Sequence, residues 1–119
     1  MEVFRCILFV WGLVLDIVLL GVLPLFMGND AIFCELIKFG CGSVDVKVSL
    51  AYGMLVNGCC RAAAGWFGDR TSWLLCMATM ALEVAMTLHM SDEKVAVYLC
   101  GVTFVYMMAT LPAAKSKAA

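Results

Sequence analysis

Residues 6–27 read CILFVWGLVLDIVLLGVLPLFM, and this stretch decides the class of the fold. It holds a single charge, Asp16, near its middle. As a helix rising about 1.5 Å per residue, it would be about 33 Å long. The hydrocarbon layer of a bilayer is roughly 30 Å thick, so the stretch predicts a transmembrane helix.

The composition of the whole chain agrees with this prediction. Its 119 residues are 65% hydrophobic and 14% charged, with a mean hydropathy of +1.02. A typical soluble domain is roughly 45–50% apolar and about 25% charged, and a domain this small has too little interior to bury the difference. The composition therefore argues against a soluble globular protein. The net charge of −1, without any basic block, gives nucleic-acid binding no electrostatic basis.

Three more apolar stretches follow the first. Polar turns of about four residues separate the last three, and turns that short make neighbouring helices antiparallel. We predict an all-α integral membrane protein with no sheet, built as one transmembrane domain over residues 1–119. The expected spans are at about 6–27, 48–67, 72–90 and 95–111.

The first loop, residues 28–47, is longer than the others. Apolar residues at helical spacing predict a short amphipathic segment at the membrane surface, namely Ile32, Phe33, Leu36 and Ile37. Cys34 and Cys41 share this loop and would pair if that side of the membrane is oxidising, which the sequence leaves open.

Four spans place both termini on one side of the membrane. Positive charges favour that side by four to three, which favours termini in the cytoplasm, matrix or stroma. The terminal side has Arg5, Arg70, Lys115 and Lys117, and the opposite side has Lys38, Lys47 and Lys94.

Charged residues inside the spans are the most informative feature. Asp16, Arg61 and Glu83 would each cost about 2.5–3.5 kcal/mol at the centre of an isolated helix. Helical spacing puts Arg61 and Asn57 on one stripe, and the depths of the three charges match within the reach of a guanidinium. We predict a structural intramembrane polar network of Asp16, Arg61, Glu83 and Asn57 that fixes the order of the helices.

A second interpretation of the same residues is a proton or ion path. Two carboxylates against one guanidinium leave a surplus charge of −1, so one carboxylate is protonated or is matched by a group on another chain. Transporters usually show inverted repeats and broken helices, which this sequence lacks. A small ion or proton transporter that uses Asp16, Arg61 and Glu83 therefore stays an alternative.

Small residues within the spans predict close helix packing, because they let backbones approach each other. The face with Ala78, Ala81 and Ala85, or the fourth span, is expected to bury against another chain. The predicted packing positions are Gly53, Gly58, Ala62, Ala78, Ala81 and Ala85.

The run Ala51-Tyr52-Gly53, then Arg61, and then Leu82-Glu83 resembles the four-helix ergosterol-biosynthesis scaffold family of the endoplasmic reticulum. The resemblance covers about residues 1–111, mainly as topology. The spacings from Gly53 to Arg61 and from Arg61 to Glu83 are shorter here, so no residue role is carried over. The resemblance implies a non-enzymatic tether that holds other membrane proteins together.

The chain has almost no extramembrane mass with which to do chemistry. One histidine is too few for a bis-histidine haem, and the sequence shows no zinc-ligand spacing, phosphate loop or catalytic set. We expect no enzyme activity, no catalytic or metal site and no cofactor, with bound structural lipids left open.

The expected role is that of a non-catalytic accessory or scaffold subunit of a large multi-subunit membrane complex. A respiratory or ATP synthase complex of the mitochondrial inner membrane is the first choice of host. The alternatives are the endoplasmic reticulum, as a tether of sterol-synthesis enzymes, and the thylakoid. The expected partners are other membrane subunits and lipids, without nucleic acid.

Overall fold

The chain folds into helices. The computed structural model describes residues 2–38, 41–90 and 94–113, and no residue in these ranges lies in a strand. The first three helices follow one another as one continuous rod. The helices are α1 (Glu2–Val10), η1 (Trp11–Val22), α2 (Leu23–Phe26), α3 (Ala31–Leu36), α4 (Val44–Phe67), α5 (Arg70–Met90) and α6 (Val95–Ala109).

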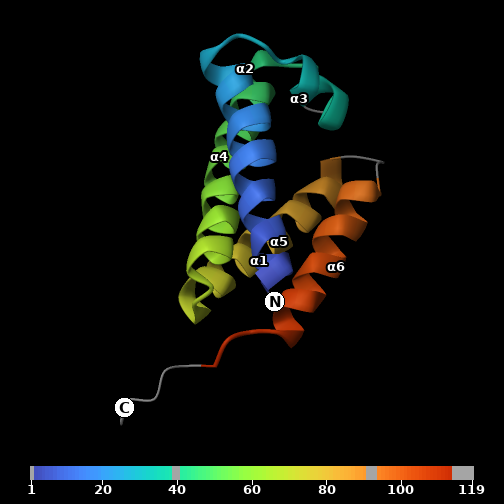
Figure 1. Cartoon of the computed structure of the whole chain (residues 1–119). Helices are drawn as coiled ribbons and strands as arrows, with labels where there is room; N and C mark the ends of the chain where they lie inside the picture. Colours follow the sequence, from blue (N-terminus) through green and yellow to red (C-terminus); the bar gives the residue numbers. More distant parts are fainter. Residues whose placement is uncertain (1, 39–40, 91–93, 114–119) are drawn as a thin grey trace.

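The long helices form an up-down bundle (Figure 1). The rod of α1 and η1 lies along α4, α5 crosses α4 at an angle, and α6 packs against α5. The start of α1 and the end of α6 lie at one end of the bundle, and α3 lies at the other (Figure 1). The predicted antiparallel order of neighbouring helices is confirmed, and the two ends of the helical region lie at the same end of the bundle.

The helix limits differ modestly from those expected. The first helix begins at Glu2 rather than at residue 6, and α4 begins at Val44 rather than at residue 48. Some of the added residues are charged. Hydropathy excludes charged residues from a predicted span, but they are compatible with a helix. The negative charge of Asp45, in the first turn of α4, interacts favourably with the positive end of the helix dipole and so stabilises this start of the helix. The short helix expected in the first loop is present as α3, with Phe33 turned inward and fully buried.

The middle of the first rod is not the α-helix that was expected. Over Trp11–Val22 it is a π-helix, whose hydrogen bonds run from residue i to i+5 and widen the turn. Residues four or five apart therefore line up on one side, and this side is buried: Gly12, Asp16, Leu20 and Gly21. Nearly every residue here is apolar, so the sequence has no periodicity that could have signalled the wider turn.

A glycine ends α4. Gly68 has φ +66°, a left-handed conformation in which a side chain would be strained. Arg5 covers the end of this helix, donating from Nε to the Gly65 carbonyl at 3.0 Å and from Nη2 to the Trp66 carbonyl at 2.6 Å. The predicted turn at 68–71 is thus present, although α5 already begins at Arg70. Most of the predicted turn at 91–94, and the tail lysines at 115 and 117, lie outside the described residues.

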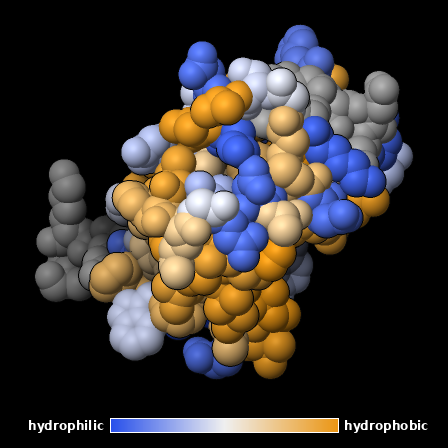
Figure 2. Space-filling model, turned by 90° about the horizontal axis from the view of Figure 1, so that it is seen from above, coloured by the Kyte–Doolittle hydropathy of each residue, from blue (hydrophilic) through white to orange (hydrophobic). Residues whose placement is uncertain are grey.

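Two helices are long and apolar enough to cross a membrane, the rod Glu2–Phe26 and the segment Arg70–His89. The apolar segment Val95–Ala109 is shorter, and α4 does not meet the same criteria within the described residues. Many large hydrophobic side chains of the helices are exposed. Figure 2, which looks down on the bundle, shows hydrophilic residues gathered on part of this face, with hydrophobic residues around much of the rest.

Candidate functional site

Arg61 joins three helices at one point. Its side chain is 1% exposed and projects from α4. Its Nη1 forms an ion pair with Asp16 of η1, and its Nη2 lies 2.5 Å from Glu83 Oε2 of α5. The structure thus brings together the three charged residues that the sequence singled out.

The other predicted member, Asn57, also belongs to this network. Its Nδ2 donates to Glu83 Oε1 at 2.5 Å. The two oxygens of Glu83 are therefore held by different residues of α4, which fixes the rotation of α5 against α4. Helical spacing was enough to find Asn57, because it lies one turn before Arg61 on the same helix.

Two members were missed from the sequence. The Cys100 thiol lies 3.2 Å from Glu83 Oε2 and donates to it, which extends the network to α6. The Trp11 ring lies 4.5 Å from Arg61 Cζ, a cation–π contact that covers the guanidinium. A cysteine in an apolar stretch has the pattern of a small hydrophobic residue, although its S–H is a weak donor. Tryptophan has no polar signature in a hydropathy pattern.

The charge of the network does not balance. Asp16 and Glu83 oppose one guanidinium, which leaves −1 if both carboxylates are ionised. Glu83 receives bonds from Asn57, Arg61 and Cys100, whereas the side chain of Asp16 receives one from Arg61 alone among the described residues. Asp16 is 2% exposed, so it is a buried carboxylate with capacity for a further donor.

A cavity of about 260 Å³ adjoins the network. Residues of η1, α4, α5 and α6 form its walls. Residues of α3 and the two residues that follow α3 line one end. On α4 it extends from Arg61 to Leu50, which is about 16 Å along a helix. Asp16, Arg61 and Glu83 therefore form a charged patch in this cavity, and its other lining residues are apolar apart from Glu35, Lys38, Thr87 and Cys100.

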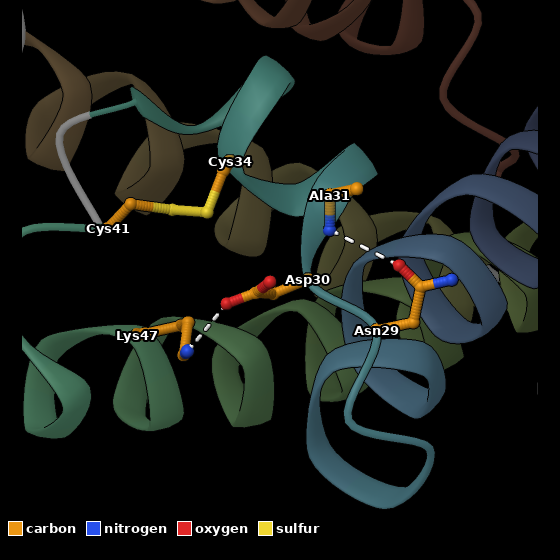
Figure 3. The surroundings of a disulfide bond; sticks show 6 residues. All are labelled: Asn29, Asp30, Ala31, Cys34, Cys41 and Lys47. Carbon is orange, nitrogen blue, oxygen red and sulfur yellow. Dashed lines mark hydrogen bonds and ion pairs between the residues drawn. A yellow bond between two sulfur atoms is a disulfide. The ribbon is translucent and has the colours of Figure 1, made fainter.

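One disulfide and two hydrogen bonds hold the loop at the α3 end (Figure 3). Cys34 and Cys41 form a disulfide, with their Cα atoms 5.6 Å apart. The Lys47 ammonium donates to Asp30 Oδ2 at 2.7 Å, and this hydrogen bond and the positive charge hold the pKa of Asp30 below its usual value. The Ala31 N–H donates to the side chain of Asn29 at 3.3 Å. The pairing of the two cysteines, which the sequence left open, is made in the structure.

Glycines set the distance between η1 and α4. A Cβ on Gly58 would lie 2.7 Å from the Gly12 carbonyl oxygen, and a Cβ on Gly12 would lie 2.6 Å from the Ala62 backbone nitrogen. Gly58 and Ala62 therefore lie at the close contact that small residues predicted. Gly65, whose Cβ would meet the backbone of Phe9, makes a similar contact that the sequence did not single out.

The prediction that Gly53 is a helix-packing position is wrong. It is exposed, and a Cβ there would meet nothing within 4 Å. The buried line of α4 runs through Met54 and Gly58 to Arg61, one position away from Gly53. Ala78, Ala81 and Ala85 are also exposed. Their contact with another chain stays a prediction.

The disulfide gives a prediction about orientation. Disulfides persist in oxidising compartments, so we expect the α3 end to face the oxidising side and the end with Arg5 to face the reducing side. In sealed vesicles whose outer face is the oxidising side of the native membrane, a membrane-impermeant reductant followed by an impermeant maleimide polymer should add mass to Cys34 and Cys41. The double variant Cys34→Ser, Cys41→Ser should lose this reductant-dependent labelling. Labelling of the two cysteines without any reductant would contradict the prediction.

The chain matches no known protein family, and neither a curated protein nor a solved structure shows significant similarity to it. No group of three His, Cys, Asp or Glu residues in the described part of the chain is placed to hold a metal ion. The class of protein defined by fold and site is an all-helical chain with apolar helices of membrane-spanning length and a buried charge network beside a cavity.

Proposed function

We propose that this chain is an integral membrane protein with four transmembrane helices, and that it is a non-catalytic accessory or scaffold subunit of a large membrane complex. The rod Glu2–Phe26 and the segment Arg70–His89 have the length and hydropathy of spans. α4 is about 36 Å long, and its Arg61 is neutralised inside the bundle. α6 is about 22 Å long and would cross with its flanking residues or where the bilayer thins.

The single observation that carries the scaffold role is the outward face of α5. Ala78, Ala81 and Ala85 are exposed there, and Ala81 and Ala85 have the small-xxx-small spacing of close helix contacts. Small residues leave a groove on a helix that a second helix fills well. This face therefore suits a neighbouring membrane subunit.

The ion pairs of Arg61 support the same role. Arg61 is ion-paired within the chain, so the bundle has no need of a partner to neutralise this residue. A rigid bundle that presents fixed outer faces is what a scaffold requires. Such a subunit would act by position and shape, without a catalytic residue.

The proposed hosts are the respiratory and ATP synthase complexes of the mitochondrial inner membrane. A disulfide at the α3 end is consistent with a membrane that separates an oxidising compartment from a reducing one. If sterol-synthesis enzymes co-purify in place of respiratory subunits, the chain is an endoplasmic-reticulum tether, and photosynthetic subunits would indicate a thylakoid host. If the protein migrates as a free monomer or dimer in native electrophoresis with a mild detergent, the scaffold proposal is contradicted.

The contact face gives a direct prediction. Ala81→Phe should fill the groove on α5 and release the chain from a large complex, because a bulky ring prevents close approach of a second helix. Native electrophoresis should move at least about half of the protein to a small species, while circular dichroism stays unchanged. Val56→Phe is the matched control, because Val56 is 61% exposed on α4, away from this face and from the fourth span. If both variants remain in the large complex, Ala81 does not contact a partner.

Ion or proton transport is the second candidate function. The observation that favours it is the cavity, which Asp16, Arg61 and Glu83 line together. A carboxylate that exchanges a proton beside a cavity is a plausible element of a proton path. Proton or ion flux in liposomes, compared between the native chain and a variant without the three charges, tests this function.

A further inference from the structure

We propose that the cavity beside Asp16, Arg61 and Glu83 binds a single-chain amphiphile with a protonated amino head group. The ammonium would bind at the charged patch, and the hydrocarbon chain would lie along the apolar walls. This proposal concerns a ligand of the chain itself, so it stands or falls independently of any partner subunit.

The charge of the network selects a cation. With both carboxylates ionised, the buried cluster has a surplus of −1, and an uncompensated charge in an apolar interior is very costly. One bound ammonium would bring the cluster to neutrality. An anionic head group would raise the negative charge to −2, and a neutral one would leave the surplus in place.

The hydrogen bonds point to Asp16 as the contact. Glu83 already receives three donors, from Asn57, Arg61 and Cys100. Asp16 receives one donor from the described residues, that of Arg61, and it lines the cavity. An ammonium carries three donors and no acceptor, so it fits a carboxylate with unused acceptor capacity.

The shape of the cavity favours a ligand with a single alkyl chain. Its volume is about 260 Å³, just under the roughly 300–1,000 Å³ of ordinary small-molecule sites. It is elongated, about 16 Å from Arg61 to Leu50 along α4. Leu15, Leu20, Met54 and Met86 are among its apolar lining residues. These dimensions suit one alkyl chain and leave no room for a two-chain lipid.

The experiment compares two probes of equal length, decylamine and decanol. Purified protein in a neutral detergent is titrated with tritiated decylamine in a scintillation proximity assay, with unlabelled decylamine or decanol as competitor. We expect saturable binding, and competition by decylamine at a concentration at least tenfold lower than by decanol. Equal competition by the two probes, or the absence of saturable binding, would overturn the proposal.

Variants then test the assigned contact. Asp16→Asn keeps the shape of the side chain but brings the cluster to neutrality, so decylamine affinity should fall at least tenfold. Glu83→Gln makes the same change in charge and serves if Asp16→Asn does not fold, as judged by gel filtration and circular dichroism. Asp45→Asn is the matched control, because Asp45 is exposed in the first turn of α4 and should leave binding unchanged. Undiminished binding in a folded Asp16→Asn or Glu83→Gln protein would show that the ammonium does not bind at this cluster.

Discussion

Arg61→Ala should lower the free energy of unfolding by about 3–5 kcal/mol, which is the usual cost of removing one partner from a buried ion pair. The change removes the contacts of α4 with Asp16 on η1 and Glu83 on α5 at the same time. It also exposes a face of the Trp11 ring. The freed carboxylates should take up protons in the apolar interior, so the loss stays well below the cost of burying two bare charges. Unfolding in mixed micelles, followed by circular dichroism, measures the change.

Arg70→Ala is the matched control for this experiment. Arg70 is exposed, and its Nη1 donates to the Pro112 carbonyl at 2.9 Å, so its loss should cost less than about 1 kcal/mol. If Arg61→Ala were as stable as Arg70→Ala, Arg61 would not hold the helices together.

A neutralised variant separates the scaffold role from transport. Combining Arg61→Met with Asp16→Asn and Glu83→Gln removes all three charges together, and replacing a whole buried cluster often restores stability. A scaffold should then assemble normally into its complex. A transporter should fold and assemble but lose its proton or ion flux in liposomes, and this result would reject the structural interpretation of the network.

Gly58→Ala should destabilise the bundle by about 1–3 kcal/mol, the usual cost of forcing an extra methyl group into a close contact. The new Cβ would lie 2.7 Å from the Gly12 carbonyl oxygen and 2.8 Å from Asp16 Cβ. The first of these atoms belongs to the backbone of η1 and cannot turn away, so the two helices must separate. Separation also pulls Asp16 from Arg61, which adds to the loss.

Gly53→Ala is the same chemical change on the same helix. A Cβ there meets nothing within 4 Å, so the substitution should stabilise α4 by about 0.5–1 kcal/mol by reducing the freedom of the unfolded chain. The two variants should therefore shift the unfolding midpoint in opposite directions. A similar shift for both would mean that Gly58 is not at the closest contact of the two helices.

The sequence by itself determined the features that depend on local chemistry. Long apolar stretches and short polar turns indicate an all-helical chain with antiparallel neighbours, because a helix satisfies its own backbone hydrogen bonds. The rarity of charges in these stretches made Asp16, Arg61 and Glu83 stand out. A buried guanidinium needs partners, and the depths of Asp16 and Glu83 put both carboxylates within reach of Arg61.

Only the tertiary structure decided which face of each helix lies inward. On helices that are apolar all round, periodicity does not separate buried from exposed positions, so Gly53 was placed inside although Met54 and Gly58 take the contact. The bond from Cys100 to Glu83 depends on which helix lies opposite, and the π-helix of η1 has no signal in its nearly uniform apolar sequence. The cavity likewise exists because α5 crosses α4 at an angle, a relation between distant segments that no single stretch of sequence contains.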